Sequence, residues 1–187
     1  FAPVAMLGTG PVVLAVTSKL PVNSVQELLA LAREKPGQLN YASAGVGSFQ
    51  HLASALFKLQ SGVDMVHIPF KGGGPALVDV IAGNTQIAIG SLIQMLPQIR
   101  SGRLRPYAVT SKTRLAAAPE IPTVDEAGLP GFYMAVWHGI WAPKATPQLI
   151  IAKINAAIVE ALADPAVRAK LADLGQEIPP REQQTPE

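Results

Sequence analysis

The sequence predicts an α/β fold whose sheet is mainly parallel. Two observations lead to this prediction. Apolar runs of strand length alternate along the chain with amphipathic runs of helical period, and turns that contain glycine or proline separate the runs. With 187 residues, about half of them apolar, the chain is long enough for one or two compact domains.

The first predicted elements alternate strictly. Residues 10–18 are typical of a strand, and Ser24 followed by Glu27 has capping-box spacing, which predicts a helix from 25 to 35. A short strand at 39–43 precedes a helix at 48–59, whose inward face is expected to consist of Leu52, Ala55, Leu56 and Leu59. Further along we expect strands at 63–70, 85–90 and 104–111, and helices at 72–83 and 91–102, the last one bent or ended near Pro97.

The rest of the chain is predicted to begin with a loop at 112–130. A long apolar strand is expected at 133–143, and two amphipathic helices within 146–175, separated by Asp164 and Pro165. The chain starts without Met, in what resembles the middle of a strand, so we expect a processed or truncated beginning.

Composition excludes several classes of protein. The formal charge of +2 is too small to indicate nucleic-acid binding, which calls for a clustered basic face. The chain has no cysteine, which excludes disulfides and thiolate catalysis, and its apolar runs are too short to span a membrane.

Two glycine-rich turns are the candidate binding site. Each follows a predicted strand and opens a predicted helix, a position where backbone amides and the helix dipole favour an anion. The residues expected to bind a ligand in the first turn are Ser43, Ala44, Gly45, Gly47 and Ser48. Those expected in the second turn are Lys71, Gly72, Gly73, Gly74 and Ala76.

Other interpretations of these turns stay open. Either one can be an ordinary tight turn, and Lys71 can be a solvated charge. The run "GVGSFQ" has only two glycines of the dinucleotide motif, with Gln50 in place of the third. His51, His67 and His138 lack metal-type spacing, and no nucleophile is paired with a base, so the pattern indicates binding without catalysis, metal or cofactor.

Four segments resemble one known family. They are "LNYASAGVGSFQHLASALF", "GVDMVHIPFKGGGPALVDVIAG", "IPTVDEAGLPGF" and "WHGIWAPKATP", and their order and spacing are similar to those of the periplasmic solute-binding proteins of tripartite tricarboxylate transporters, the Bug or TctC-like family. The resemblance implies a type II, Venus-flytrap receptor in the periplasm that binds a small carboxylate and delivers it to membrane transporter subunits. It also implies that Ser91, where relatives often have another polar residue, lies at the site.

The resemblance further implies that the chain is incomplete at its front. Residues 1–9 and 136–187 would belong to a partial first lobe, and 10–135 to a complete second lobe. Unpaired helices of the partial lobe would expose a stripe that favours self-association: Ile151, Ile154, Ile158 and Leu162. Two rival interpretations are a small α/β enzyme that binds a phosphate or nucleotide at the Gly45–Gly47 turn, and a structural remnant that binds nothing.

Overall fold

The computed structural model describes residues 1–186, which divide into two compact units. Unit 2 is Pro11–Met134, and unit 1 consists of Phe1–Gly10 and residues 135–186. Strand β1 (Ala2–Thr17) contributes residues to both units. The assignment of the two units to receptor lobes remains a prediction.

Strands and helices alternate in unit 2, which confirms the α/β class. After β1 come α1 (Val25–Glu34), β2 (Asn40–Ser43), α2 (Phe49–Ser61), β3 (Val66–Pro69), α3 (Gly73–Ala82), β4 (Ile87–Ser91), α4 (Leu92–Arg100) and β5 (Leu104–Val109). Between residues 110 and 134 the chain has no helix or strand, which confirms the expected loop at 112–130 and makes the strands on either side shorter than expected. Pro97 lies inside α4, so the helix does not end there.

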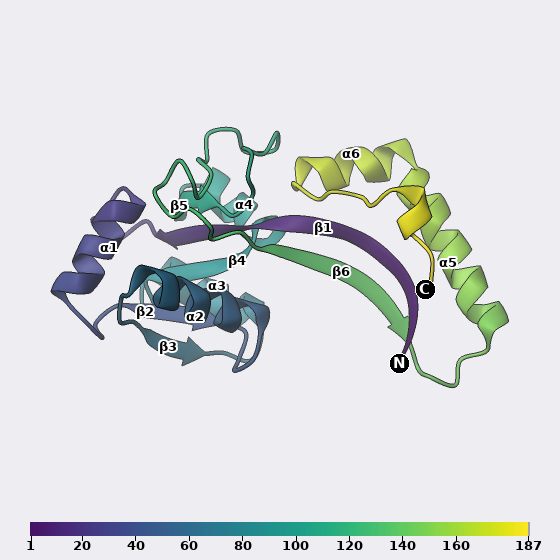
Figure 1. Cartoon of the computed structure of the whole chain (residues 1–187), viewed down its shortest axis with the longest axis horizontal. Helices are drawn as coiled ribbons and strands as arrows, with labels where there is room; N and C mark the ends of the chain where they lie inside the picture. The colour runs from purple at the N-terminus through teal and green to yellow at the C-terminus, as the bar shows by residue number, and fades with distance from the viewer. Residues whose placement is uncertain (187) are drawn as a thin grey trace. The chain divides into compact units, whose positions relative to one another are not determined.

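The sheet of unit 2 is mixed, which corrects the expectation of a mainly parallel one. Its strand order is β3-β2-β4-β1-β5 (Figure 1). Strand β2 is parallel to β3 and β4, whereas β1 is antiparallel to both β4 and β5. Four strands therefore share one direction, and β1 fills the gap between two of them in the opposite direction. The apolar pattern of a buried strand carries no information about direction, which is why the sequence did not predict this.

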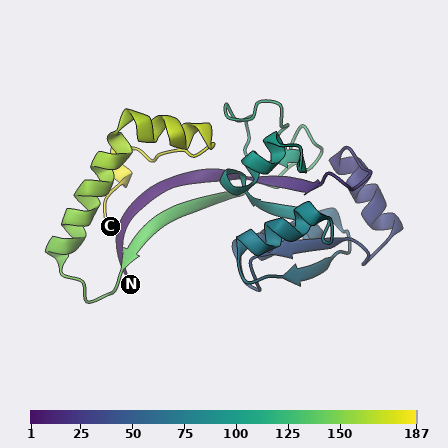
Figure 2. The same cartoon turned by 180° about the vertical axis from the view of Figure 1, so that it is seen from behind.

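Helices cover both faces of this sheet (Figures 1 and 2). Alternate residues of β1 point to opposite faces, as the two-residue period of a strand requires. Val12, Leu14 and Val16 join one core with α1 and α2, and Val13 and Ala15 join another with α3 and α4. Unit 2 is thus a three-layer α/β/α structure.

The prediction of a cap on α1 is confirmed, whereas the prediction of the buried face of α2 differs from the structure. The Ser24 hydroxyl accepts a hydrogen bond from the Glu27 backbone N–H, as the capping-box spacing predicted. On α2, however, the buried face consists of Ala53, Ser54 and Phe57, while Leu52 and Leu59 are 58% and 80% exposed. The expected inward face of α2 was therefore only partly correct: Leu56 packs against the core, but Leu52 and Leu59 face outward, and Phe57 packs edge-to-face on Phe132 from a distant loop.

Unit 1 contains the strand pair β1 and β6 (Ala135–Ala142) and the helices α5 (Gln148–Ala163), α6 (Pro165–Asp173) and η1 (Arg181–Gln183). Its small core consists of Val4, Ala142 and Ile151, with Ile158 packed against it. Ile151 and Leu162 are buried, whereas Ile154 is 40% exposed. The predicted exposed stripe is therefore only partly correct. Ile151 is buried because α5 packs on β1.

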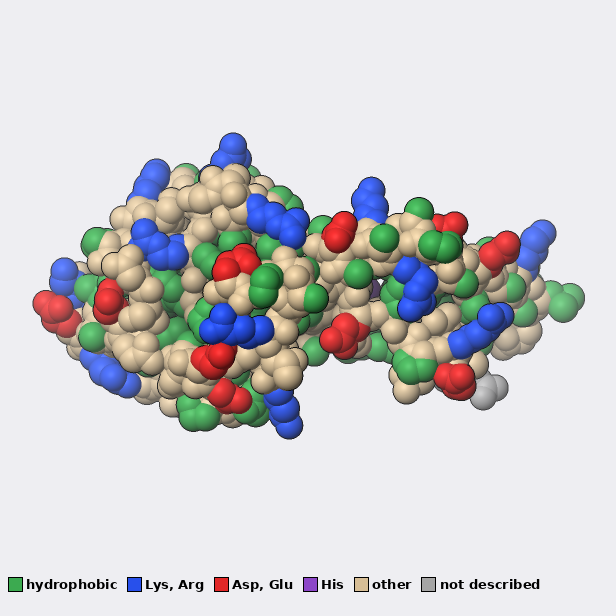
Figure 3. Space-filling view, turned by 90° about the horizontal axis from the view of Figure 1, so that it is seen from above, with side chains coloured by type: hydrophobic (Ala, Val, Ile, Leu, Met, Phe, Trp, Pro, Cys, Tyr) green, Lys and Arg blue, Asp and Glu red, His purple; other side chains and the backbone are tan. Residues whose placement is uncertain are grey.

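None of the helices within residues 1–186 has the length and apolar composition that a membrane-spanning helix requires. On the face shown in Figure 3, basic and acidic side chains are interspersed over the surface.

Candidate functional site

The two glycine-rich turns lie at the same edge of the unit 2 sheet. Strand β2 ends at Ser43, which is paired with Pro69 at the end of the parallel strand β3. Strand β4 is parallel to β2 on its other side, so its carboxyl end lies at this edge too. We call this the carboxyl edge, meaning the ends of β2, β3 and β4 with the turns that follow them. The prediction that both turns share one edge is confirmed.

The first glycine turn, residues 43–48, has a backbone shape that needs glycine. Gly45 has a φ of 127° and Gly47 a φ of 78°, a region that other residues rarely adopt. A Cβ on Gly45 would also lie 3.4 Å from the carbonyl oxygen of Phe70. The first turn therefore runs close to Phe70, the residue that precedes the second turn.

Ser43 is fully buried beneath this turn. Its Oγ donates to the Gly45 carbonyl oxygen and accepts from the Gly45 N–H, both at 3.1 Å. The same oxygen lies 2.6 Å from His67 Nε2. The expectation that Ser43 offers its hydroxyl to a ligand does not fit this geometry, because the hydroxyl is committed to the fold. Ser43 instead shapes the turn.

Ser48 ends the turn as the N-cap of α2. Its Oγ accepts from the His51 N–H at 3.3 Å, and the same hydroxyl can still donate its own proton. The Gly47 N–H donates to His51 Nδ1 at 3.1 Å, so this amide points back to the helix. The Gly47 N–H is therefore already paired, and the expectation that Gly47 contacts a ligand remains a prediction.

The second glycine turn, residues 71–76, opens α3. Gly72 is the N-cap with a φ of 119°, and it has no side chain that could satisfy the first amides of the helix. Lys71 is exposed, Gly74 is exposed and Ala76 is buried. The amino end of α3 therefore presents backbone donors beside an exposed cation.

A third helix begins at the same edge. The N-cap of α4 is Ser91, whose side chain makes no capping hydrogen bond. Ser91 is 8% exposed, and its Oγ has no hydrogen-bond partner within residues 1–186. The expectation that Ser91 lies at the ligand site remains a prediction, and the structure places the residue at the carboxyl end of β4.

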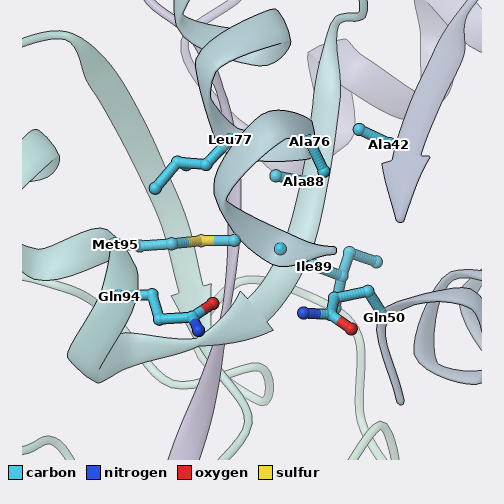
Figure 4. Close-up of a pocket in the computed structure, with 9 residues that line it drawn as sticks. Ala42, Gln50, Ala76, Leu77, Ala88, Ile89, Gln94 and Met95 are labelled. Atoms are coloured by element: carbon cyan, nitrogen blue, oxygen red, sulfur yellow. The ribbon is translucent and has the colours of Figure 1, made fainter. Parts of the chain in front are cut away.

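A small pocket opens where the three helices begin (Figure 4). Its volume is about 20 Å³, room for a single water-sized group. Two side-chain amides point into it from opposite sides, Gln50 from the first turn of α2 and Gln94 from the first turn of α4. The rest of the lining is small or apolar: Ala42, Gly73, Ala76, Leu77, Ala88, Ile89 and Met95.

The first residue of α3 lies between these amides. A Cβ on Gly73 would be 3.2 Å from Gln94 Oε1 and 3.4 Å from Gln50 Nε2. The starts of α2, α3 and α4 therefore meet at one point. Gln50 and Gln94 were not predicted from the sequence, although both occupy the first turn of a helix that follows a strand ending at the carboxyl edge, and that position was the available signal.

Two histidines lie beneath the first glycine turn. The rings of His51 and His67 are stacked with centroids 4.1 Å apart, and Tyr41 stacks on the same His67 ring at 5.0 Å. Burial lowers the pKa of His67, and the neighbouring His51 lowers that pKa further. Within residues 1–186, no cluster of His, Asp or Glu is arranged to bind a metal ion.

Comparisons with known sequences identify relatives of the chain. The family model described as "Tripartite tricarboxylate transporter family receptor", TctC, matches residues 1–186. Protein BugT of Bordetella pertussis is 39% identical over 165 residues, which cover 88% of this chain and 51% of BugT. The UPF0065 protein in the tcbD-tcbE intergenic region of a Pseudomonas species is 42% identical over 176 residues, 94% of this chain and 52% of that protein. The chain thus spans about half the length of these curated relatives.

Solved structures show the same fold. MatC from Rhodopseudomonas palustris with bound malate has a TM-score of 0.94 and 36% identity, covering 100% of this chain and 63% of MatC. The periplasmic binding protein BugD has a TM-score of 0.93 and 31% identity, with 100% of this chain and 62% of BugD covered. An R. palustris protein with adipate has a TM-score of 0.90 and 36% identity over 95% of this chain and 60% of that one. These matches confirm the periplasmic-binding-protein-like fold class.

Proposed function

We propose that this chain, which belongs to the family of tripartite tricarboxylate transporter receptors, binds one carboxylate of a small organic acid at the carboxyl edge of unit 2. We further propose that it acts in the periplasm and delivers the acid to the membrane subunits of such a transporter. Members of this family are solute-binding receptors, not enzymes.

The observation that carries the proposal is the meeting of three helix starts at one pocket. The amino end of a helix has a partial positive charge and free N–H groups, so it favours an anion. Gln50 and Gln94 add side-chain N–H donors, and the nine lining residues include no Asp or Glu that would repel a carboxylate. Hydrogen bonds to a charged acceptor contribute about 1.5–3 kcal/mol each.

The size of the pocket indicates which part of the ligand it receives. A volume of about 20 Å³ fits one small group, such as a carboxylate oxygen, and not a whole di-acid. Bound malate in MatC and adipate in the R. palustris protein support a small dicarboxylate as the ligand class.

Calorimetry on the chain tests the ligand class. Malate and adipate should bind, whereas their neutral diamides should not, because the diamides lack the charge that the helix starts favour. ATP and NAD serve as the comparison ligands for a nucleotide site. Binding of a nucleotide in preference to both acids would contradict the proposal.

A pair of variants on α4 tests the location of the site. Gln94→Ala removes an amide that faces the pocket, and we expect roughly tenfold weaker binding of malate, the equivalent of one hydrogen bond to a charge. Gln98→Ala changes the same residue type one turn further along α4, outside the pocket lining, and should bind like the wild type. Equal affinities of the two variants would place the ligand elsewhere.

A further inference from the structure

We propose that His51 is a positioning residue, whose neutral imidazole holds the first glycine turn in its ligand-accepting shape and whose protonation releases that turn. The ligand-accepting part of this inference rests on the proposed function. The hold on the turn is independent of it and can be measured without any ligand.

The hydrogen bond between Gly47 and His51 requires an unprotonated ring nitrogen. The Gly47 N–H donates to His51 Nδ1 at 3.1 Å, and an N–H group can only donate. A protonated imidazole has N–H groups at both ring nitrogens and cannot accept. Protonation of His51 must therefore break this bond and turn two donors toward each other. The turn then loses a contact at the glycine where its backbone φ is 78°.

The His51 ring is held in place by a column of stacked rings. Its plane lies 14° from that of His67, at a centroid distance of 4.1 Å, and His67 stacks in turn on Tyr41. His67 Nε2 lies 2.6 Å from the Oγ of buried Ser43, which is hydrogen-bonded to both the N–H and the carbonyl of Gly45. The column thus holds the turn twice, at Gly45 through Ser43 and at Gly47 through His51.

The groups that face His51 decide the direction of the pH effect. Tyr41 from β2 and His67 from β3 are the titratable residues of the column, and two cationic rings at 4.1 Å would repel each other. Lys58 on α2 is bound to Asp64 and to the Met65 carbonyl, and Lys71, after β3, is exposed. The lowered pKa of His67 keeps that ring neutral at pH values where an ordinary histidine is charged. Acid therefore weakens the column, and neutral pH preserves it.

An opposite effect competes with this one. A cationic His51 near the turn would attract a carboxylate, so simple electrostatics predicts tighter binding at low pH. Loss of the Gly47 contact predicts weaker binding at low pH. The sign of the pH dependence of binding therefore separates a positioning role from a charge-attraction role.

Two variants of His51 isolate the acceptor from the charge. In His51→Asn the side-chain oxygen takes the place of Nδ1 as an acceptor but cannot titrate, and in His51→Ala the acceptor is lost. NMR of the 187-residue chain between about pH 5.5 and 8 would follow the Gly47 amide shift, its exchange protection and the ring signals of His51.

In the wild type, we expect the amide shift to titrate with the His51 ring and the protection to fall roughly tenfold on protonation, the scale of one hydrogen bond. The Asn variant should keep its protection at both ends of the range, and the Ala variant should lack it at both. The inference is overturned if the Gly47 amide shift does not change together with the ring signals of His51, or if the Gly47 amide stays protected from exchange in the Ala variant. Circular dichroism of the three proteins checks that each is folded.

Malate binding at pH 8 and pH 6 completes the test, because carboxylates stay ionised across that range. Wild-type affinity should be lower at pH 6 than at pH 8, while the Asn variant should show little change. Tighter wild-type binding at pH 6, or an equal fall in the Asn variant, contradicts the positioning role. If no protein binds malate or adipate at either pH while the Gly47 amide titrates as expected, the proposed function fails and the hold of His51 on the turn stands.

Discussion

Adding one methyl group at Gly73 is the sharpest test of the pocket. Gly73 is the first residue of α3 and does not have a positive φ, so alanine fits its backbone. The new Cβ would lie 3.2 Å from Gln94 Oε1, close enough that this amide must shift by a few tenths of an ångström, and 3.4 Å from Gln50 Nε2, which is van der Waals contact. Gly73→Ala should therefore be compatible with the fold and disturb only the pocket.

The size of the effect follows from the volume. The pocket holds about 20 Å³, and a methyl group takes up roughly the space of one water, so the substitution fills it. A carboxylate that is excluded loses at least one charge-assisted hydrogen bond, about 1.5–3 kcal/mol. We expect malate affinity to fall by roughly 10- to 100-fold. The melting temperature should stay the same or rise slightly, because alanine reduces the entropy of the unfolded chain.

Gly74→Ala is the matched control. It lies one residue further along α3, also without a positive φ, and its Cβ would meet no atom within 4 Å. Gly74→Ala lowers the entropy of the unfolded chain in the same way, but its methyl group does not enter the pocket. The malate affinity of this variant should therefore equal that of the wild type. Isothermal calorimetry and thermal melts of the three proteins provide both quantities. If Gly73→Ala binds malate as tightly as Gly74→Ala does, the pocket between Gln50 and Gln94 is not where the carboxylate binds.

Three further predictions concern stability and association. Phe57→Ala should lower the free energy of unfolding by about 3–5 kcal/mol, because the Phe57 side chain is 1% exposed. Leu59→Ala on the same helix should change that free energy by less than about 0.5 kcal/mol. Equal losses for the two variants in urea denaturation would contradict the observed buried face of α2. The pKa of Glu126 lies below its ordinary value of 4.5, first because of the Thr123 backbone N–H and then because of Arg114, so its contribution to stability is present above that pH and is lost as the pH falls through the lowered pKa. Melting curves of Glu126→Gln should accordingly show a smaller loss below pH 4.5 than the wild type, and parallel losses would argue against this carboxylate. Light scattering should detect self-association through the exposed face of β6, where Trp137 is 58% exposed, and Trp137→Lys should reduce it; a monodisperse wild-type monomer would refute this.

The sequence by itself determined the order of the elements and the position of the two glycine turns. Both depend on local chemistry: alternating apolar periods select strand or helix, and glycines such as Gly45 and Gly72 permit backbone angles that other residues avoid. Because parallel neighbouring strands end at one edge, the sequence also predicted that the two turns meet. The family signature followed from the same motifs.

Tertiary contacts decided which side chains the edge presents. A helical period gives the spacing of an apolar face but not which of two overlapping faces is buried. Phe57 is buried, and Leu52 and Leu59 are exposed, because Phe57 packs on Phe132, a residue far away in the sequence. The antiparallel direction of β1 likewise depends on its pairing with β4 and β5, which are far from it in the sequence.

The roles of polar residues at the site were decided in the same way. The buried Ser43 hydroxyl has His67 of β3 as a hydrogen-bond partner. Gln94 is a pocket residue only because the start of α4 lies beside the start of α3. A short polar side chain can serve as a cap, a support or a ligand contact with the same local sequence around it. Only its neighbours in space determine which of these roles it takes, since hydrogen-bond partners are selected by distance and direction and not by order along the chain.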